Sequence, residues 1–250
     1  MGYIQSFDRY EKKYILTMEQ FSAFLEKTSE IIRPDSYGQY TICSIYLDTE
    51  DYMFIRNSIE KPVYKEKLRL RSYGVPDEND SVFFEIKKKY RGIVYKRRIS
   101  AAESDLYDYA VSGVISERLA QSADAQILSE IDYIMRKYHP VPKVCVAYDR
   151  QAFEGISDTS LRVTFDSAIR CRTDRLRLSS GNGGEHITVG NYGSDYRLME
   201  IKTGSAVPYE LVKILSELKI YPASFSKYGE IYKQIILPKL IEKKGCAVKC

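Results

Sequence analysis

Cations alternate with leucines in the segment Lys67–Arg71, which reads K-L-R-L-R. Successive side chains of an extended strand point to opposite faces, so Lys67, Arg69 and Arg71 share one face while the leucines share the other. Arginine forks and lysine point charges on one face could bind anions such as phosphates. A half-buried sheet also turns a charged face to water, so the anion-binding interpretation depends on whether other strands repeat the pattern.

Other segments with strand character do repeat it. Alternation predicts strands over residues 6–16, 40–47, 67–74, 82–89, 93–99, 143–153, 161–171 and 196–203. The cations in phase on their charged faces are Arg9, Lys13, Lys67, Arg69, Arg71, Lys87, Lys89, Lys96, Arg98, Arg150, Arg162 and Lys202. The acids in the same phase are chiefly Glu11, Glu85 and Glu200. The whole chain has 38 Lys+Arg against 34 Asp+Glu, so the positive charge is segregated.

Helical segments separate these strands. Thr17 and Gln20 form a capping-box pattern, and helical spacing continues to Ile31 or Ile32, which predicts a helix ending before Pro34. Ser226 is a candidate cap for the final helix. Residues 101–139 have helical spacing and predict an insertion between strands. The Gly-rich stretch 179–191 lacks the ending of a P-loop, so we expect a loop there.

The predicted fold is α+β. We expect an eight-stranded antiparallel β barrel, a tunnel whose lumen holds the cationic faces while helices pack outside on the apolar faces. Like charges in a confined space of low dielectric constant repel strongly, so such a lumen requires an anionic guest. A triphosphate or a polyphosphate has the charge density that fits.

The few acids of the cationic face allow two interpretations. Glu11, Glu85 and Glu200 each stand two residues before a lysine. They could compensate charge, as surface carboxylates often do. With phosphates present, they could instead hold Mg²⁺ or Mn²⁺, which prefer oxygen ligands and bridge phosphates. Glu200 is the first candidate for the metal role.

The ordered motifs R-Y-E-K-K, K-L-R-L-R-S-Y-G, F-E-I-K-K-K, K-R-R, Y-D-R, L-R-V-T-F-D, L-M-E-I-K and S-K-Y run from about Phe7 to Tyr232. This series resembles the VTC domain, the polyphosphate polymerase branch of the triphosphate tunnel metalloenzyme (CYTH-like) superfamily. The resemblance implies an eight-stranded tunnel, metal-dependent handling of a nucleoside triphosphate and growth of a phosphate chain.

The strand phase and the resemblance together assign roles to residues. The expected catalytic residues are Arg69, Arg71, Lys87, Arg150 and Lys202. The expected substrate-binding residues are Lys13, Lys67, Lys96, Arg98, Arg162 and Lys227, and the expected metal ligands are Glu200, Glu11 and Glu85. The hydrolases of the superfamily begin with E-x-E-x-K, whereas Arg9 replaces the first acid here. That departure favours phosphate transfer over activation of water.

The expected activity is therefore transfer of the γ-phosphate of ATP, or of another nucleoside triphosphate, to a growing inorganic polyphosphate chain with Mn²⁺ or Mg²⁺. A tripolyphosphate or nucleoside triphosphate hydrolase would use the same cations and release orthophosphate. A non-catalytic polyphosphate-binding module would bind without turnover. These three alternatives remain open from the sequence.

Composition excludes other classes of protein. A formal charge of +4 is too small to indicate a nucleic-acid partner, and no apolar run is long enough for a membrane span. Five cysteines without metal-site spacing and the lack of a signal peptide favour a cytoplasmic protein with reduced thiols. We expect one domain over residues 1–240 and a flexible tail over 241–250, in which Cys246 and Cys250 have no assigned role.

Overall fold

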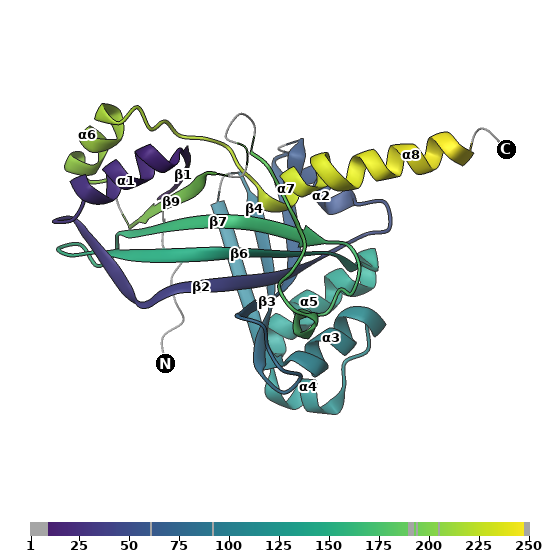
Figure 1. Ribbon diagram of the computed structural model, residues 1–250. Coiled ribbons are helices and arrows are strands. Elements are labelled where there is room, and N and C mark those ends of the chain that lie inside the picture. Colours follow the sequence, from purple (N-terminus) through teal and green to yellow (C-terminus); the bar gives the residue numbers. More distant parts are fainter. Residues whose placement is uncertain are drawn as a thin grey trace. The chain divides into compact units, whose positions relative to one another are not determined.

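An antiparallel β sheet with helices packed against it dominates the computed structural model (Figure 1). The structure describes residues 10–247 except 61, 92, 190–192, 194 and 205. The strands are β1 (Tyr10–Leu16), β2 (Ile32–Asp48), β3 (Tyr64–Tyr73), β4 (Ser81–Tyr90), β5 (Ile93–Ala102), β6 (Val141–Gly155), β7 (Arg162–Arg172), β8 (Glu185–His186) and β9 (Arg197–Thr203). The order in the sheet is β1-β9-β7-β6-β2-β3-β4-β5, and the short β8 pairs with β7. The predicted antiparallel sheet is confirmed; its closure into a tunnel stays a prediction.

The helices lie between and after these strands. They are α1 (Met18–Lys27), α2 (Met53–Ile59), α3 (Glu103–Ser112), α4 (Glu117–Ser122), α5 (Ala125–Tyr138), the 3-10 turn η1 (Leu178–Ser180), α6 (Tyr209–Glu217), α7 (Lys227–Ile231), the π-helical turn η3 (Tyr232–Ile236) and α8 (Leu237–Ala247). Thr17 and Gln20 form the predicted capping box at α1, and Ser226 caps α7. Within the described part of the chain, none of these helices has the length and apolarity needed to span a membrane.

The chain divides into two compact units. The first unit contains the chain as far as Tyr40 together with Tyr148–Ile169 and Thr188–Phe225. The second unit contains Thr41–Ala147, Arg170–Ile187 and the chain from Ser226 onward. Each unit has a hydrophobic core of its own, so each is described separately below.

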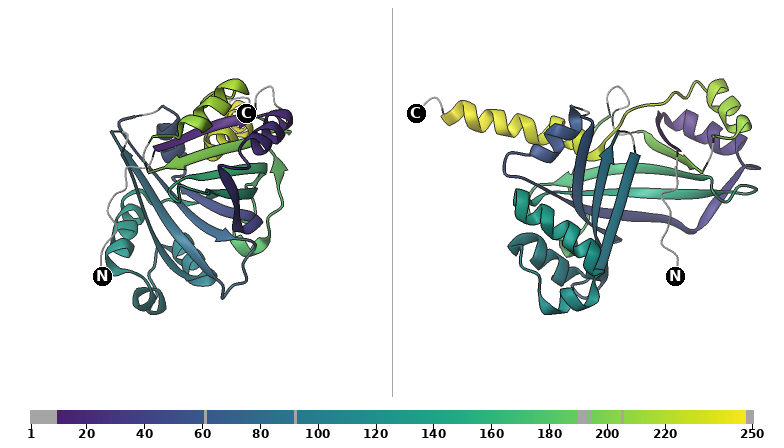
Figure 2. Two further views of the ribbon diagram at one scale, coloured as in Figure 1. Left: turned by 90° about the vertical axis from the view of Figure 1, so that its left-hand side faces the viewer. Right: turned by 180° about the vertical axis from the view of Figure 1, so that it is seen from behind.

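The core of the second unit lies between β3, β4 and the helices α3 and α5 (Figures 1 and 2). Leu68 and Leu70 of β3 and Phe84 of β4 are fully buried and belong to one cluster with Leu106 and Ile131 from those helices. Because side chains alternate along a strand, burial of these leucines places the cations of β3 on its opposite face. The predicted arrangement of helices against the apolar face is confirmed in this unit.

The core of the first unit is organised around aromatic contacts. The ring centroids of Phe21 and Phe24, on α1, lie 4.9 and 5.8 Å from that of Phe165 on β7, in edge-to-face geometry. Leu211 of α6 and Met199 of β9 complete the same cluster. Edge-to-face pairs stabilise a core beyond the area that they bury, and here they attach α1 to the apolar face of the sheet.

Two local predictions were wrong. The first helix ends before Pro34 but does not reach Ile31 or Ile32. Thr28 ends it, with the hydroxyl donating to the Phe24 carbonyl at 2.7 Å, and β2 begins at Ile32. Ile32 is buried in the first-unit core as the first residue of β2, so this apolar residue belongs to a strand and not to a longer helix. The Gly-rich stretch is not entirely loop, because Glu185 and His186 of β8 pair with β7.

Other boundaries differ less. The predicted first strand is described from Tyr10, and Arg9 lies outside the described residues. The helices α3, α4 and α5 occupy the predicted insertion. Helix α8 continues to Ala247, into the segment for which we expect a tail, while residues 248–250 lie outside the described part.

Candidate functional site

The cations of β3, β4 and β5 surround one buried carboxylate in the second unit. The antiparallel register aligns Arg69, Glu85 and Arg98 across the three strands, and it aligns Lys67, Lys87 and Lys96 in the adjacent row. Directly opposite residues lie close enough for their side chains to interact. We call this group the Glu85 cluster; its members are Lys67, Arg69, Arg71, Glu85, Lys87, Lys96 and Arg98.

Glu85 is shared by three cations. Its side chain is 1% exposed, and Arg69 approaches its Oε2 through Nε at 2.7 Å and Nη2 at 2.6 Å. Lys96 Nζ lies 2.6 Å from Oε1, and Arg71 Nε lies 3.8 Å from Oε2. Both carboxylate oxygens therefore face cations, and Glu85 acts as the internal counterion of the cluster.

The charges shift the titration of these groups. Burial alone would raise the pKa of Glu85, but Arg69, Arg71 and Lys96 lower it to about 2. Burial lowers the pKa of Lys96, although Glu85 opposes that shift. Because Glu85 is ionised at neutral pH and is outnumbered by its cationic neighbours, the cluster retains a positive charge that an anion can neutralise.

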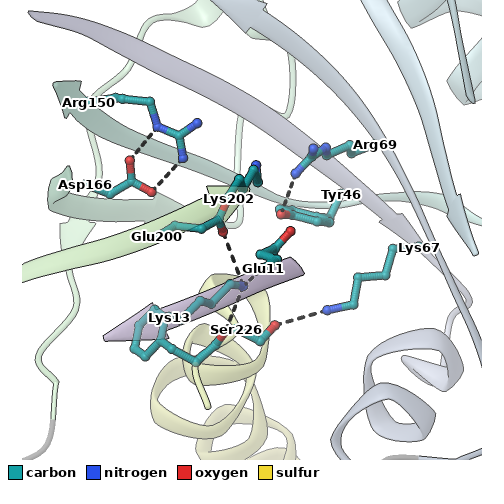
Figure 3. Close-up of polar contacts among 11 residues, drawn as sticks. Glu11, Lys13, Tyr46, Lys67, Arg69, Arg150, Asp166, Glu200, Lys202 and Ser226 are labelled. Carbon is teal, nitrogen blue, oxygen red and sulfur yellow. Dashed lines mark hydrogen bonds and ion pairs between the residues drawn. The ribbon is translucent and has the colours of Figure 1, made fainter. Parts of the chain in front are cut away.

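The S-K-Y motif is attached to the same strands in the second unit. Lys67 Nζ donates to Ser226 Oγ at 3.0 Å, and Arg69 Nη1 donates to the Tyr46 hydroxyl at 3.2 Å (Figure 3). The ring of Tyr46 stacks on that of Tyr228, with centroids 4.8 Å apart. These contacts fix the first turn of α7 beside β2 and β3.

The remaining predicted residues of this unit lie around that arrangement. The guanidinium of Arg98 lies 4.2 Å from the centroid of the Phe83 ring, on the strand next to its own. Lys87 stands between two other lysines in the ladder. Lys227 is the first residue of α7 and directly follows the cap Ser226.

A second group of charges lies on β1, β7 and β9 in the first unit. The register aligns Glu11, Lys202 and Arg162 in one row, and it aligns Lys13, Glu200 and Thr164 in the next. Acid and base therefore alternate along β1 and along β9, and each acid of one of these two strands lies opposite a base of the other. We call this group the Glu200 cluster; its members are Glu11, Lys13, Arg162, Glu200 and Lys202.

Glu200 is held by two lysines. Lys202 Nζ lies 2.5 Å from Oε1, and Lys13 Nζ lies 3.8 Å from Oε2 (Figure 3). Burial alone would raise the pKa of Glu200, but Lys202 and Lys13 lower it below its usual range. Lys13 also lies 3.7 Å from Glu11 and donates to the Phe225 carbonyl at 3.2 Å. A single ammonium thus stands between the two carboxylates.

Arg150 is held by a carboxylate that we did not predict as a partner. Its Nε and Nη2 donate to the two oxygens of Asp166 at 2.6 and 2.9 Å, in a bidentate pair (Figure 3). Burial alone would lower the pKa of Arg150, but Tyr148, Asp166 and Glu200 raise it. Arg162 is half-exposed and lies 3.5 Å from Glu154. Asp166 thus orients Arg150, while Arg162 faces water.

A family model described as the VTC domain matches residues 8–236. The chain belongs to the VTC domain family. A curated relative, vacuolar transporter chaperone complex subunit 4 of Trypanosoma brucei brucei, is 25% identical over 162 residues. That match covers 55% of this chain and 20% of the relative, so this VTC domain spans about a fifth of the relative's length.

A solved structure shares the fold. It is a Bacillus halodurans protein, described provisionally as an adenylate cyclase, with a TM-score of 0.52 and 12% sequence identity to this VTC domain. The likeness covers 90% of this chain and 96% of that chain. The family match confirms the recognition of a VTC domain from the ordered motifs, and the solved structure shows the same fold.

The carboxylates differ in how well they fit a metal ion. Among the described residues, no three carboxylate, imidazole or thiol side chains gather where they could hold a cation. Mg²⁺ commonly takes only one or two protein carboxylates and completes its shell with water and substrate phosphates. Glu200 and Glu11 fit that limited role because they lie close together, on either side of the Lys13 ammonium and within 3.8 Å of it. Glu85 fits poorly, because it is 1% exposed and three cations surround it, whereas Glu200 is 15% exposed and faces two lysines.

Two polar residues of this VTC domain were missed from the sequence. Asp166 has the same strand phase as Arg162, which could have added it to the in-phase acids. Tyr46 lies directly opposite Arg69 in the β2–β3 register, a relation that depends on pairing between strands. Alternation within 40–47 gives the phase of Tyr46 along its own strand but not which residue it faces.

Proposed function

We propose that this VTC domain transfers the γ-phosphate of ATP, or of another nucleoside triphosphate, to inorganic polyphosphate. The observation that carries the proposal is that Lys and Arg outnumber the carboxylates in each of the two clusters. In such a site, phosphate oxygens can displace the carboxylate from its cations, because they accept charge-assisted hydrogen bonds from Lys and from Arg side chains. Membership of the VTC domain family supports the same assignment.

The reaction needs positioning more than covalent help from the protein. A terminal oxygen of the polyphosphate chain forms a bond to the γ-phosphorus, while the bond from that phosphorus to the β–γ bridging oxygen breaks and ADP leaves with the electron pair. In the second unit, Arg69, Arg71 and Lys87 would hold phosphate oxygens and neutralise developing negative charge. In the first unit, Arg150 and Lys202 would bind phosphate oxygens in the same way. No nucleophilic side chain is required.

A divalent cation would complement these residues. Glu200, with Glu11, would hold Mn²⁺ or Mg²⁺ together with oxygens of the substrate. Such an ion would supply Lewis-acid stabilisation of the phosphate charge. Lys13 and Lys202 would then keep Glu200 ionised, and Lys13 would hold both carboxylates in place.

The test is purified protein incubated with ATP and Mn²⁺, followed for ADP, for orthophosphate and for polymer on a gel. ADP accompanied by polymer supports the proposal. Equal amounts of ADP and orthophosphate without polymer would instead identify a hydrolase. Binding of polyphosphate without any metal-dependent turnover would identify a binding module.

The Glu200→Gln variant should need at least about ten-fold more Mn²⁺ for half-maximal release of ADP, because an amide is a weaker ligand than a carboxylate. Titration of Mn²⁺ at fixed ATP measures this shift. The matched control is Glu217→Gln, since Glu217 lies half-exposed on α6 and pairs with Lys27. If Glu200 is only a counterion, the variant will keep the wild-type dependence on Mn²⁺ and bind phosphate more tightly.

A further inference from the structure

The Tyr46 hydroxyl accepts a hydrogen bond, but no residue of the described part of the chain accepts its own proton. Arg69 Nη1 donates to it at 3.2 Å, while the other two nitrogens of that guanidinium face Glu85. Among the residues that the structure describes, none accepts the Tyr46 O–H. Since Tyr46 is only 8% exposed, water has little access to supply that acceptor.

The hydroxyl is held in place from behind. The Tyr46 ring stacks on the Tyr228 ring at an interplanar angle of 23°, and the Tyr228 hydroxyl donates to Asp48 Oδ2 at 2.9 Å. Asp48 is fully buried and also accepts the backbone N–H groups of Phe54 and Ile55 at the start of α2. A residue supported in this way presents its polar group without a large loss of conformational entropy on binding.

The surroundings of the hydroxyl are cationic. Lys67, Arg69 and Arg71 of β3 act on it, whereas the nearest acid of its own strand, Asp48, is engaged by α2 and Tyr228. Burial alone would raise the pKa of Tyr46, but these three cations and the hydrogen bond from Arg69 lower it to about 7. The site therefore favours negative charge at the position next to the hydroxyl.

We propose that Tyr46 is a phosphate ligand of the Glu85 cluster, whose hydroxyl donates its proton to an oxygen of a condensed phosphate that Arg69 also binds. The ligand would thus supply both the missing acceptor and the missing negative charge. This inference rests on the proposed function in one respect, because it requires the cluster to bind condensed phosphates.

The first test compares affinities for inorganic tripolyphosphate at about pH 6, where the phenol is neutral. Calorimetry on wild-type protein and on Tyr46→Phe should show about ten-fold weaker binding by the variant, the size expected for a hydrogen bond to a charged group. Tyr209→Phe, altered on the exposed surface of α6, should bind as wild type does. Equal affinity of Tyr46→Phe and wild type would overturn the inference.

The second test follows ionisation of the phenol by the near-ultraviolet absorbance of tyrosinate, which is not overlaid by tryptophan because the chain has none. Ligand-free wild type should titrate near pH 7, and Tyr46→Phe should lack that step. Tripolyphosphate should move the step upward, since a bound anion opposes ionisation. An unmoved step in protein that binds tripolyphosphate contradicts the inference; no binding by wild type contradicts the proposed function itself.

Discussion

Replacing Glu85 with glutamine should lower the free energy of unfolding at neutral pH by about 3 kcal/mol. The carboxylate is 1% exposed and faces Arg69, Arg71 and Lys96, so its loss leaves three cations without their shared counterion. The expected loss is at the lower end for a broken buried ion pair, because Lys96 is 42% exposed and water can solvate it. Chemical denaturation at pH 7 measures the difference.

The same pair of proteins should show a characteristic dependence on pH. The folded state lowers the pKa of Glu85 from 4.5 to about 2, so the unfolded state takes up the proton more readily. The stabilisation by Glu85 is therefore complete above about pH 4.5 and disappears as the pH falls through about 2. We expect the stability difference between wild type and Glu85→Gln to be constant from pH 5 to 8 and to shrink below that range.

A matched control for Glu85 exists in the same unit. Glu130 also faces two cations, with Lys88 Nζ at 2.6 Å and Arg97 Nη1 at 3.4 Å, but its side chain is more exposed. Glu130→Gln should lower the free energy of unfolding by less than Glu85→Gln does, because solvent screens the charges that remain around residue 130. Two results would contradict the role of Glu85 as counterion. One is an equal loss of unfolding free energy in Glu85→Gln and Glu130→Gln; the other is a stability difference between wild type and Glu85→Gln that stays constant down to pH 2.

Replacing Arg69 with alanine should reduce release of ADP from ATP by at least about a hundred-fold, the usual effect of losing one donor to transition-state charge. Arg69 is central to its cluster because it contacts both Glu85 and Tyr46. The fold should survive, since Glu85 keeps Lys96 and Arg71 as partners. Steady-state kinetics and a thermal melt on the same preparation separate loss of activity from unfolding.

Two further variants define the role of Arg69. Arg69→Lys should retain intermediate activity, because it keeps the charge and loses the planar fork. Arg97→Ala should turn over as wild type does, since Arg97 lies on the opposite face of β5 and pairs with Glu130. A folded Arg69→Ala protein with wild-type turnover would exclude Arg69 from the reaction.

Local chemistry explains which parts of the fold could be predicted. The capping box at Thr17 and the cap at Ser226 depend on residues within one turn, and both were identified. Alternation in 67–71 likewise predicted that Arg69 and Arg71 share a face. The end of the first helix was missed because Ile31 and Ile32 suit a helix or a strand equally well, and packing of Ile32 in the core decides between them.

The partners within the clusters could not be predicted, because they depend on register between strands. The pairing of Arg150 with Asp166 joins β6 to β7, and the contact of Arg69 with Tyr46 joins β3 to β2. A shift of one residue in either pairing would turn these side chains to opposite faces. Composition and phase therefore identify which residues carry charge, while only the assembled sheet identifies which charges neutralise one another.

The carboxylates built into both clusters should make anion binding selective for anions with several phosphate groups. Glu85 and Glu200 already occupy their cations, so an incoming anion must displace them and gains only the difference between two sets of ion pairs. Orthophosphate offers only one phosphate group, so it gains little binding free energy from this displacement. In a condensed chain, each bound phosphate raises the local concentration of the next, so avidity grows with chain length. We therefore expect the carboxylates to set a minimum length for a ligand, and their removal to admit shorter anions.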